Sequence, residues 1–243
     1  MSQAESVDRL IAGEVQAHFA CATIGRQMIV LEQTGSTNDA ILQLATHQGA
    51  PFSSLPAVAS AKEGPPSLTN EGLVLFAEHQ TAGRGQRGNR WESAAGKGLW
   101  FSILLRPGIQ VNDSGRLTIW AMESICDVIR TEFALEPAIK LPNDVLLQGR
   151  KVAGVLVEMR AQQKAPHLAI VGIGINVNHS VEDFPPELQN RAISLAMALH
   201  RPVDRQQLAI AILRNLNRTY HKKFVTEVGT LQGQKVKASR PHR

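Results

Sequence analysis

Short apolar runs and amphipathic stretches alternate along the chain, and their spacing predicts the secondary structure. Seven apolar runs of strand length are predicted to form β-strands, at residues 28–32, 72–78, 99–105, 138–141, 145–148, 152–159 and 168–177. Three stretches with apolar residues at three- and four-residue spacing are predicted to form helices, over residues 38–47, 117–133 and 203–223. Ser36 or Thr37 can cap the first helix, and Asp204 can cap the last.

The order of these elements predicts an α+β fold. Gln148-Gly149-Arg150 is typical of a tight hairpin turn, and the strands predicted after residue 138 follow one another closely while the helices stand apart. This arrangement favours a mixed, largely antiparallel sheet flanked by helices over a doubly wound parallel sheet. Residues 49–70 contain four prolines and many small residues, and they are predicted to form a loop.

The composition is that of one large domain, with or without a small appendage. The 243 residues are 43% hydrophobic, which is enough for a sizeable core. No stretch approaches the roughly 18 apolar residues of a membrane span, and no signal-peptide pattern is visible, so we expect a cytoplasmic protein. Cys21 and Cys126 match no metal or redox spacing. Part of the net charge of +5 follows Glu227, where a solvated basic tail is favoured over a nucleic-acid site.

The segment from Gly83 to Trp91 is the strongest candidate for chemistry, because it combines three glycines, three arginines and a tryptophan. Glycines let a backbone approach a ligand, arginines offer forks of donors to phosphate or carboxylate, and tryptophan offers a flat face to a base. The segment formally matches a dinucleotide fingerprint, but a strand rather than a helix is predicted after it. The Walker and protein-kinase signatures are absent from the sequence. We therefore predict a nucleotide-phosphate loop of another kind.

Three other segments carry weaker signals. Lys140 ends a predicted strand before Pro142, where a compact positive charge can face a phosphoryl or acyl oxygen. Gly154, Gly172 and Gly174 lie inside predicted strands, a position that indicates close approach by a ligand or by another backbone. Each signal is weak alone, but the four segments together, in this order, are much more specific.

In this order the motifs resemble those of biotin protein ligases. The resemblance covers about residues 28–225 and rests on residues 36–38, 78–91, 140–145, 151–158 and 172–178. It implies a fold related to the catalytic core of class II aminoacyl-tRNA synthetases. It also implies a two-step reaction. The carboxylate of biotin attacks the α-phosphate of ATP, giving biotinyl-adenylate and pyrophosphate, and the amine of a lysine on a carrier domain then attacks the activated carbonyl.

The resemblance also implies roles for individual residues. The expected catalytic residues are Lys140, Arg84 and Arg87. Biotin is expected to contact Ser36, Thr37, Asn38, Gln80, Gly83, Arg84, Lys140 and Gly154. ATP is expected to contact Gly85, Gln86, Arg87, Gly88, Trp91, Asn143, Lys151 and Asn176, with Mg²⁺ bridging its phosphates. No dedicated general base is evident, because the activated second step needs chiefly positioning and a neutral lysine amine.

The sequence departs from the family pattern at three places. Residues 1–27 are expected to be a short extension, residues 28–225 the catalytic domain, and residues 226–243 a short basic tail without a recognisable C-terminal small barrel. The extension is too short for the winged helix-turn-helix of repressor-type members, so we expect no specific DNA binding. Gln86 stands where many members carry arginine, which leaves more of the ligand's negative charge to Arg84 and Arg87.

The expected partners are biotin, ATP and a biotin carboxyl carrier domain of acetyl-CoA carboxylase or a related carboxylase, with no membrane. The expected oligomeric state is a monomer or a homodimer. Two alternatives remain: a lipoate or octanoate ligase or transferase of the same fold, and a degenerate module that binds biotin without transferring it. The Gly83–Trp91 loop together with Ser36-Thr37-Asn38 favours biotin, because a lipoyl substrate needs a long apolar tunnel.

Overall fold

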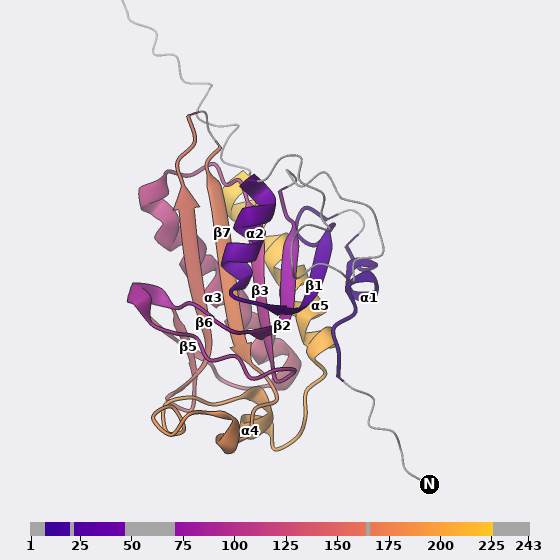
Figure 1. Cartoon of the computed structure of the whole chain (residues 1–243), viewed down its shortest axis with the longest axis vertical. Helices are drawn as coiled ribbons and strands as arrows, with labels where there is room; N and C mark the ends of the chain where they lie inside the picture. The colour runs from indigo at the N-terminus through magenta and orange to yellow at the C-terminus, as the bar shows by residue number, and fades with distance from the viewer. Residues whose placement is uncertain (1–7, 20–21, 47–70, 164–165, 226–243) are drawn as a thin grey trace, which may run out of the picture.

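The computed structural model describes residues 8–19, 22–46, 71–163 and 166–225. They contain a seven-stranded sheet with the strand order β1-β2-β3-β7-β6-β5-β4 (Figure 1). The strands are β1 (Met28–Thr34), β2 (Val74–Gln80), β3 (Gly98–Leu105), β4 (Ala138–Lys140), β5 (Asp144–Leu147), β6 (Arg150–Arg160) and β7 (Leu168–Asn176). β1 and β2 run parallel, and all other neighbouring strands are antiparallel. The predicted mixed, largely antiparallel sheet is confirmed.

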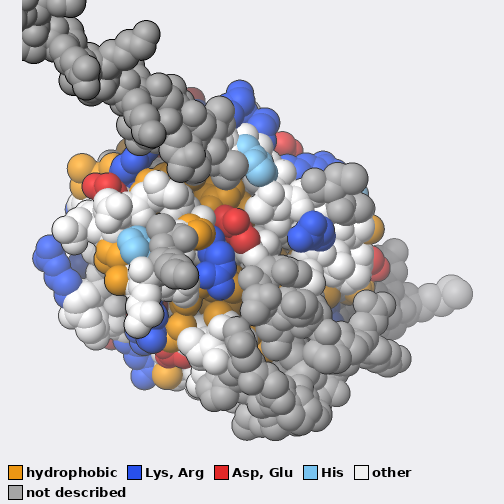
Figure 2. Space-filling view, turned by 90° about the horizontal axis from the view of Figure 1, so that it is seen from above, with side chains coloured by type: hydrophobic (Ala, Val, Ile, Leu, Met, Phe, Trp, Pro, Cys, Tyr) orange, Lys and Arg blue, Asp and Glu red, His pale blue; other side chains and the backbone are white. Residues whose placement is uncertain are grey.

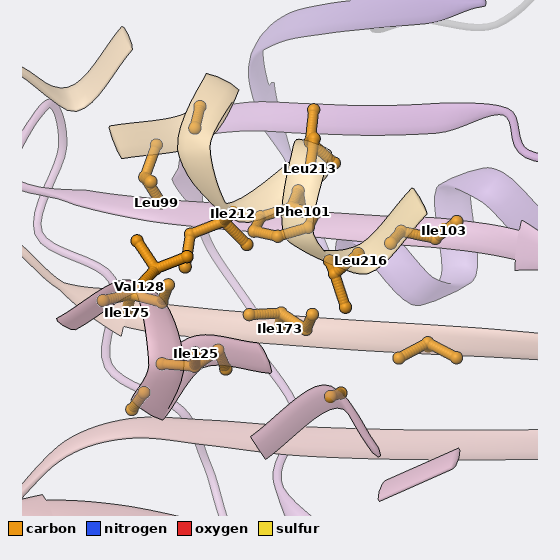
Figure 3. Packing of buried hydrophobic residues seen from close by; sticks show 14 of the residues in the cluster. Leu99, Phe101, Ile103, Ile125, Val128, Ile173, Ile175, Ile212, Leu213 and Leu216 are labelled. Atoms are coloured by element: carbon orange, nitrogen blue, oxygen red, sulfur yellow. The ribbon is translucent and has the colours of Figure 1, made fainter. Parts of the chain in front are cut away.

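Helices cover both faces of the sheet. In Figure 1, α2 (Thr37–Thr46) lies on the near face, and α3 (Ser114–Phe133) and α5 (Arg205–Tyr220) lie on the far face. Successive residues of a strand point to opposite faces. Val74 and Phe76 therefore belong to the larger core with α3 and α5, whereas Leu75 and Ala77 belong to the smaller core with α2. Figure 3 shows the larger core, where side chains of β3 and β7 meet those of α3 and α5.

The central strands β3 and β7 are buried along their whole length. Because both faces of the sheet are covered there, the two strands need apolar residues at nearly every position, which explains the continuous apolar runs in the sequence. The predicted hairpin turn joins β5 to β6, with positive φ at Gln148 (51°) and Gly149 (75°). Asp204 caps α5 as predicted, because its side chain accepts the backbone N–H of Gln207 at 2.9 Å.

Several short elements escape the sequence pattern. They are α1 (Ala12–Gln16), α4 (Leu195–Leu199), the 3₁₀ turns η2 (Gln86–Gly88), η3 (Val111–Asp113) and η4 (Val181–Asp183), and the π-helical turn η5 (His221–Val225). One or two turns of helix have too few periodic positions to give a hydrophobic signal.

The N-terminal residues pack into the same core as the sheet. Leu10, Val15 and Phe19 are buried in the larger core. Arg205 of α5 is fully buried and pairs with Asp8 at 3.1 Å. The boundary predicted at residue 28 therefore does not separate two folded units, because the segment before it completes the core.

Three predictions fall wholly or partly outside the described residues. They concern Cys21, the loop at 49–70 and the tail at 226–243. Cys126 is a free, buried thiol. None of the helices in the described part of the chain has the length and apolar character that a membrane crossing requires.

Candidate functional site

A cavity of about 150 Å³ lies on the face of the sheet that carries α2. It is bounded by the start of α2, the Gly83–Trp91 loop, the segment before β5, and the strands β6 and β7. Eleven of the residues that the sequence predicted for the site line it: Ser36, Thr37, Asn38, Gln80, Arg84, Gly85, Gln86, Trp91, Asn143, Lys151 and Gly154. Segments far apart in the sequence thus converge on one site.

Part of the cavity lining is polar and uncharged. Ser36, Thr37 and Gln80 are buried there, at the start of α2 and the end of β2. The Gln80 side chain accepts the backbone N–H of Thr37 at 2.9 Å and donates to Ser93 at 3.1 Å. This arrangement fixes the amide of Gln80 and presents neutral hydrogen-bonding groups to a ligand.

Arg84 brings a positive charge to the cavity lining. Its guanidinium binds Glu158 of β6 through two hydrogen bonds, at 3.1 and 2.7 Å, and lies 2.8 Å from Asp39 of α2. Burial acts to raise the pKa of the Glu158 carboxyl, but hydrogen bonds from Arg84 and Asn38 outweigh it, so the pKa lies below its usual value. Arg84 thus links the glycine-rich loop to α2 and β6. A ligand carboxylate that bound Arg84 would lie beside the carboxylates of Asp39 and Glu158.

Trp91 forms a wall of the cavity. A Cβ atom on Gly154 would lie 2.8 Å from its ring, and one on Gly174 would lie 2.6 Å from it. The ring meets Trp100 edge-on, with 5.9 Å between centroids. The sequence indicated that strand glycines admit a ligand or another backbone. At these two positions they admit the Trp91 side chain instead.

Lys151 is the lysine that lies in the cavity. Its Nζ is 2.6 Å from Asp144 Oδ1 and 4.9 Å from the centroid of the Trp91 ring. Asn143 is held nearby by donating to the Val155 carbonyl at 3.0 Å. The first residue of β5 and the start of β6 therefore place a carboxylate and an ammonium together in the site.

Five predicted residues do not line the cavity. Lys140 is exposed on the edge strand β4, and Arg87 and Gly88 are exposed in the loop. Gly83 is required by the backbone, because a Cβ there would lie 2.5 Å from the Trp91 carbonyl oxygen. Asn176 is buried and donates to the carbonyl groups of Lys151 at 3.3 Å and Ile193 at 3.2 Å. Their roles toward a ligand stay predictions.

Four residues at or behind the cavity were given no definite role by sequence reasoning: Asp39, Ser102, Asp144 and Glu158. Ser102 could have been noticed in the sequence, because it is the one polar residue within the apolar run 99–105. Asp144 could also have been noticed, as the acid beside Asn143 in the turn after Lys140. Asp39 and Glu158 are single acidic residues on a predicted helix and a predicted strand. Only their contacts with Arg84 in the structure distinguish them from other acidic residues.

The positive charge of the chain is not gathered on the face that Figure 2 shows. Lys and Arg side chains of the described residues are spread over it singly or in small groups, with acidic side chains between them. A nucleic-acid surface typically concentrates its basic residues on one face.

Comparison with known proteins identifies the family. Residues 56–176 match the model of the biotin/lipoate A/B protein ligase family. The bifunctional ligase/repressor BirA of Bacillus subtilis is 39% identical over 150 residues, which span 62% of this chain and 46% of the relative. The biotin--[acetyl-CoA-carboxylase] ligase of Mycobacterium tuberculosis is 33% identical over 195 residues, spanning 79% of this chain and 63% of the relative.

Solved structures agree in fold. The biotin protein ligase of Aquifex aeolicus, in complex with biotin and ATP, superposes with a TM-score of 0.60 at 27% identity, covering 83% of this chain and 75% of that one. A bipartite lipoate protein ligase from Thermoplasma acidophilum shares the fold alone, with a TM-score of 0.52 at 12% identity, over 80% of this chain and 84% of that one. The matched region is less than two thirds of either relative named above, so those proteins extend beyond it. The chain belongs to the biotin/lipoate protein ligase family, and its catalytic core is that of a biotin protein ligase.

Proposed function

We propose that this protein is an ATP-dependent biotin protein ligase. One observation carries the proposal: a single cavity is lined both by neutral hydrogen-bonding side chains, among them Thr37 and Gln80, and by the cations Arg84 and Lys151. Biotin carries the matching groups, a neutral ureido ring and a carboxylate. The names of the relatives, which include a biotin--[acetyl-CoA-carboxylase] ligase, support the same assignment.

In the first step, a carboxylate oxygen of biotin attacks the α-phosphorus of ATP, and the bond to the β-phosphate breaks to release pyrophosphate. Carboxylate and phosphates repel one another, so the protein must hold positive charge between them. Lys151 and Arg84, which both line the cavity, supply it. We place the main contact at Lys151 rather than Lys140, because only Lys151 lines the cavity.

In the second step, the ε-amine of a carrier lysine attacks the acyl carbonyl of biotinyl-adenylate, an amide bond forms and AMP leaves. The incoming ammonium must first lose a proton. Asp144 is the one carboxylate among the described residues that line the cavity, but its 2.6 Å pairing with Lys151 makes it a poor proton acceptor, so we assign the proton to solvent.

Mg²⁺ fits this site as an ion carried by the nucleotide. The described residues hold no group of three or more His, Cys, Asp or Glu side chains suited to a metal. Mg²⁺ commonly binds through substrate phosphates and one or two carboxylates, and Asp144 could supply one. When bound, the ion would neutralise charge on the phosphates. Trp91 would offer its face to adenine beside Lys151.

The partners follow from the proposed reaction. The carrier would be a biotin carboxyl carrier domain of acetyl-CoA carboxylase or a related carboxylase. A cytoplasmic location, a monomeric or homodimeric state and a lack of specific DNA binding stay predictions of the sequence.

The activation step can be tested by pyrophosphate release. We expect release from ATP with biotin, and much less with lipoate or octanoate at the same concentration. Release that favours lipoate or octanoate would support the lipoyl alternative. Biotin binding without release would support the degenerate binding module.

A further inference from the structure

Ser102 is a buried hydroxyl that lies behind the cavity. It sits in the middle of β3, is 0% exposed, and does not line the cavity. Its neighbours Phe101 and Ile103 belong to the larger core, so Ser102 points to the opposite face, which carries α2. There its Oγ atom lies 2.8 Å from Thr37 Oγ1 and 2.6 Å from Asn38 Oδ1. One hydroxyl thus contacts two consecutive residues of the proposed biotin site.

The orientation of the Asn38 amide is fixed. Its Nδ2 donates to Glu158 Oε2 at 2.7 Å, and a carboxylate can only accept. Arg84 binds both oxygens of that carboxylate, which holds it in place. Asn38 Oδ1 is therefore turned toward Ser102. A Cβ on Gly172 would collide with this oxygen, so the glycine leaves room for it.

The direction of the next two hydrogen bonds follows from the number of protons. Ser102 has one hydroxyl proton, and Asn38 Oδ1 can only accept, so Ser102 donates to Asn38. The Ser102 oxygen then accepts from the Thr37 hydroxyl at 2.8 Å. The competing contact from that hydroxyl to Gln80 Oε1 is longer, at 3.2 Å, and this oxygen already accepts the Thr37 backbone N–H at 2.9 Å. The Thr37 proton is thus held on the protein side, and the Thr37 hydroxyl oxygen, which belongs to a residue lining the cavity, can accept a hydrogen bond.

We propose that Ser102 is a positioning residue that makes the Thr37 hydroxyl a hydrogen-bond acceptor for a ring N–H of biotin's ureido group. The inference rests on the proposed function. A buried acceptor discriminates strongly in favour of a ligand with an N–H donor, because a ligand without one leaves the acceptor unpaired. Ser102 acts on Thr37 from behind the cavity and does not itself line it. The direction in which Ser102 donates is fixed by Asn38, whose amide is in turn oriented by Glu158.

The test compares two buried serines. Ser102→Ala removes the link between Thr37 and Asn38. Ser124→Ala is the matched control, because Ser124 of α3 is also buried (2% exposed) and its hydroxyl contacts Thr219 in the other core, 3.4 Å away. We would measure the Kd for biotin by calorimetry, the KM for ATP in pyrophosphate release at saturating biotin, and thermal unfolding.

We expect Ser102→Ala to raise the Kd for biotin about tenfold, because the Thr37 hydroxyl loses the nearest acceptor that holds its proton away from the ligand. The KM for ATP should stay within about twofold of wild type, and Ser124→Ala should bind biotin like wild type. A folded Ser102→Ala variant with unchanged biotin affinity, or with an equal loss toward ATP, would overturn the inference. If Ser102→Ala does not fold, Ser102→Cys decides by the same criteria, because a thiol fills the space and donates only weakly.

The same titration separates this inference from the proposed function. Failure of the wild-type protein to bind biotin would refute both. Tight binding by wild type and by Ser102→Ala alike would refute the role of Ser102 and leave the proposed function standing.

Discussion

Two lysines are candidates for the cation that meets the biotin carboxylate and the α-phosphate. Lys140 follows from the sequence pattern, because it ends a strand before a proline. The structure places it on the exposed edge strand β4, whereas Lys151 lies in the cavity beside Asp144 and Trp91. Lys140 lies on β4, the outermost strand of the sheet, whereas Lys151 lies on β6, where its side chain is close to Gly154 and the Trp91 ring. Sequence spacing gives no information on which of two nearby lysines faces a ligand.

Substitution of the two lysines should separate their roles. Lys151→Ala is expected to lower the rate of biotinyl-adenylate formation by about 10²–10³, the scale of removing one preorganised donor from a site where charge develops. Lys140→Ala should lower it far less. Single-turnover pyrophosphate release at saturating biotin measures both. A larger loss from Lys140→Ala would return that lysine to the role that the sequence predicted.

His179 is a buried histidine that favours its neutral form. Burial lowers its pKa to about 4, with a smaller opposing effect from the nearby charge of Asp183, and Lys97 acts in the same direction as burial. Its ring stacks on Phe184, with 4.9 Å between centroids, and meets Trp100 edge-on. Since Trp100 also contacts Trp91, His179 supports the wall of the cavity from behind.

The stability of the protein should depend on the charge state of His179. In the unfolded chain the pKa returns to about 6.5, so below that pH the unfolded state binds the proton first. The stability that neutral His179 contributes to the folded state is fully present above about pH 6.5 and is lost as the pH falls toward 4. We expect the free energy of unfolding to fall by about 2 kcal/mol between pH 7 and pH 5.

Urea unfolding at the two pH values measures this dependence. His179→Gln should lose about 2 kcal/mol less than wild type on going from pH 7 to pH 5. His200→Asn is the control, since His200 is exposed at a positive-φ position that asparagine tolerates. An equal pH dependence in wild type and His179→Gln would contradict the account.

At the scale of elements, the strands were predictable because their apolar runs are long and their turns carry clear signals. The turn at Gln148-Gly149 and the cap at Asp204 are examples, since each depends on local chemistry. The partners of the strand glycines were not predictable. Gly154 and Gly174 leave room for the ring of Trp91, which lies more than sixty residues earlier in the sequence. Such a long-range contact produces no local pattern in a single sequence.

The packing of Trp91 over β6 and β7 gives a test at this scale. Gly174→Ala would place a Cβ 2.6 Å from the indole, so the ring must move, at a cost of about 1–3 kcal/mol. We expect a lower Tm and weaker binding of ATP. Gly115→Ala is the control, because no atom lies within 4 Å of a Cβ there and alanine favours its helix. Equal Tm values for the two variants would contradict the proposed packing.

At the scale of the whole molecule, a buried arginine joins the N-terminal segment to the sheet. Arg205 binds Asp8 at 3.1 Å, Glu78 of β2 at 2.7 Å and the Gly98 carbonyl of β3 at 3.2 Å. Glu78 also accepts the Leu10 backbone N–H at 2.9 Å. The sequence predicted a short extension over residues 1–27 but not these contacts, because residues almost 200 positions apart leave no trace of their contact in local periodicity.

Removal of this arginine should destabilise the whole fold. Arg205→Met leaves Glu78 buried without its positive partner, and we expect a loss of about 3–5 kcal/mol in the free energy of unfolding. Arg218→Met on the same helix is the control, because Arg218 is exposed, and such surface changes usually stay within about 0.5 kcal/mol. Urea unfolding measures both. A loss below 1 kcal/mol for Arg205→Met would show that the ion pairs contribute little.

A biotin protein ligase activates biotin and transfers it to a carrier lysine. The most direct measurement is the intact mass of a purified biotin carboxyl carrier domain after incubation with the protein, ATP, Mg²⁺ and an equimolar mixture of biotin and lipoate. We expect the carrier to gain one biotinyl group, and we expect no gain when the acceptor lysine of the carrier is replaced by arginine. A carrier that stays unmodified, or that gains a lipoyl group instead, would contradict the proposed function.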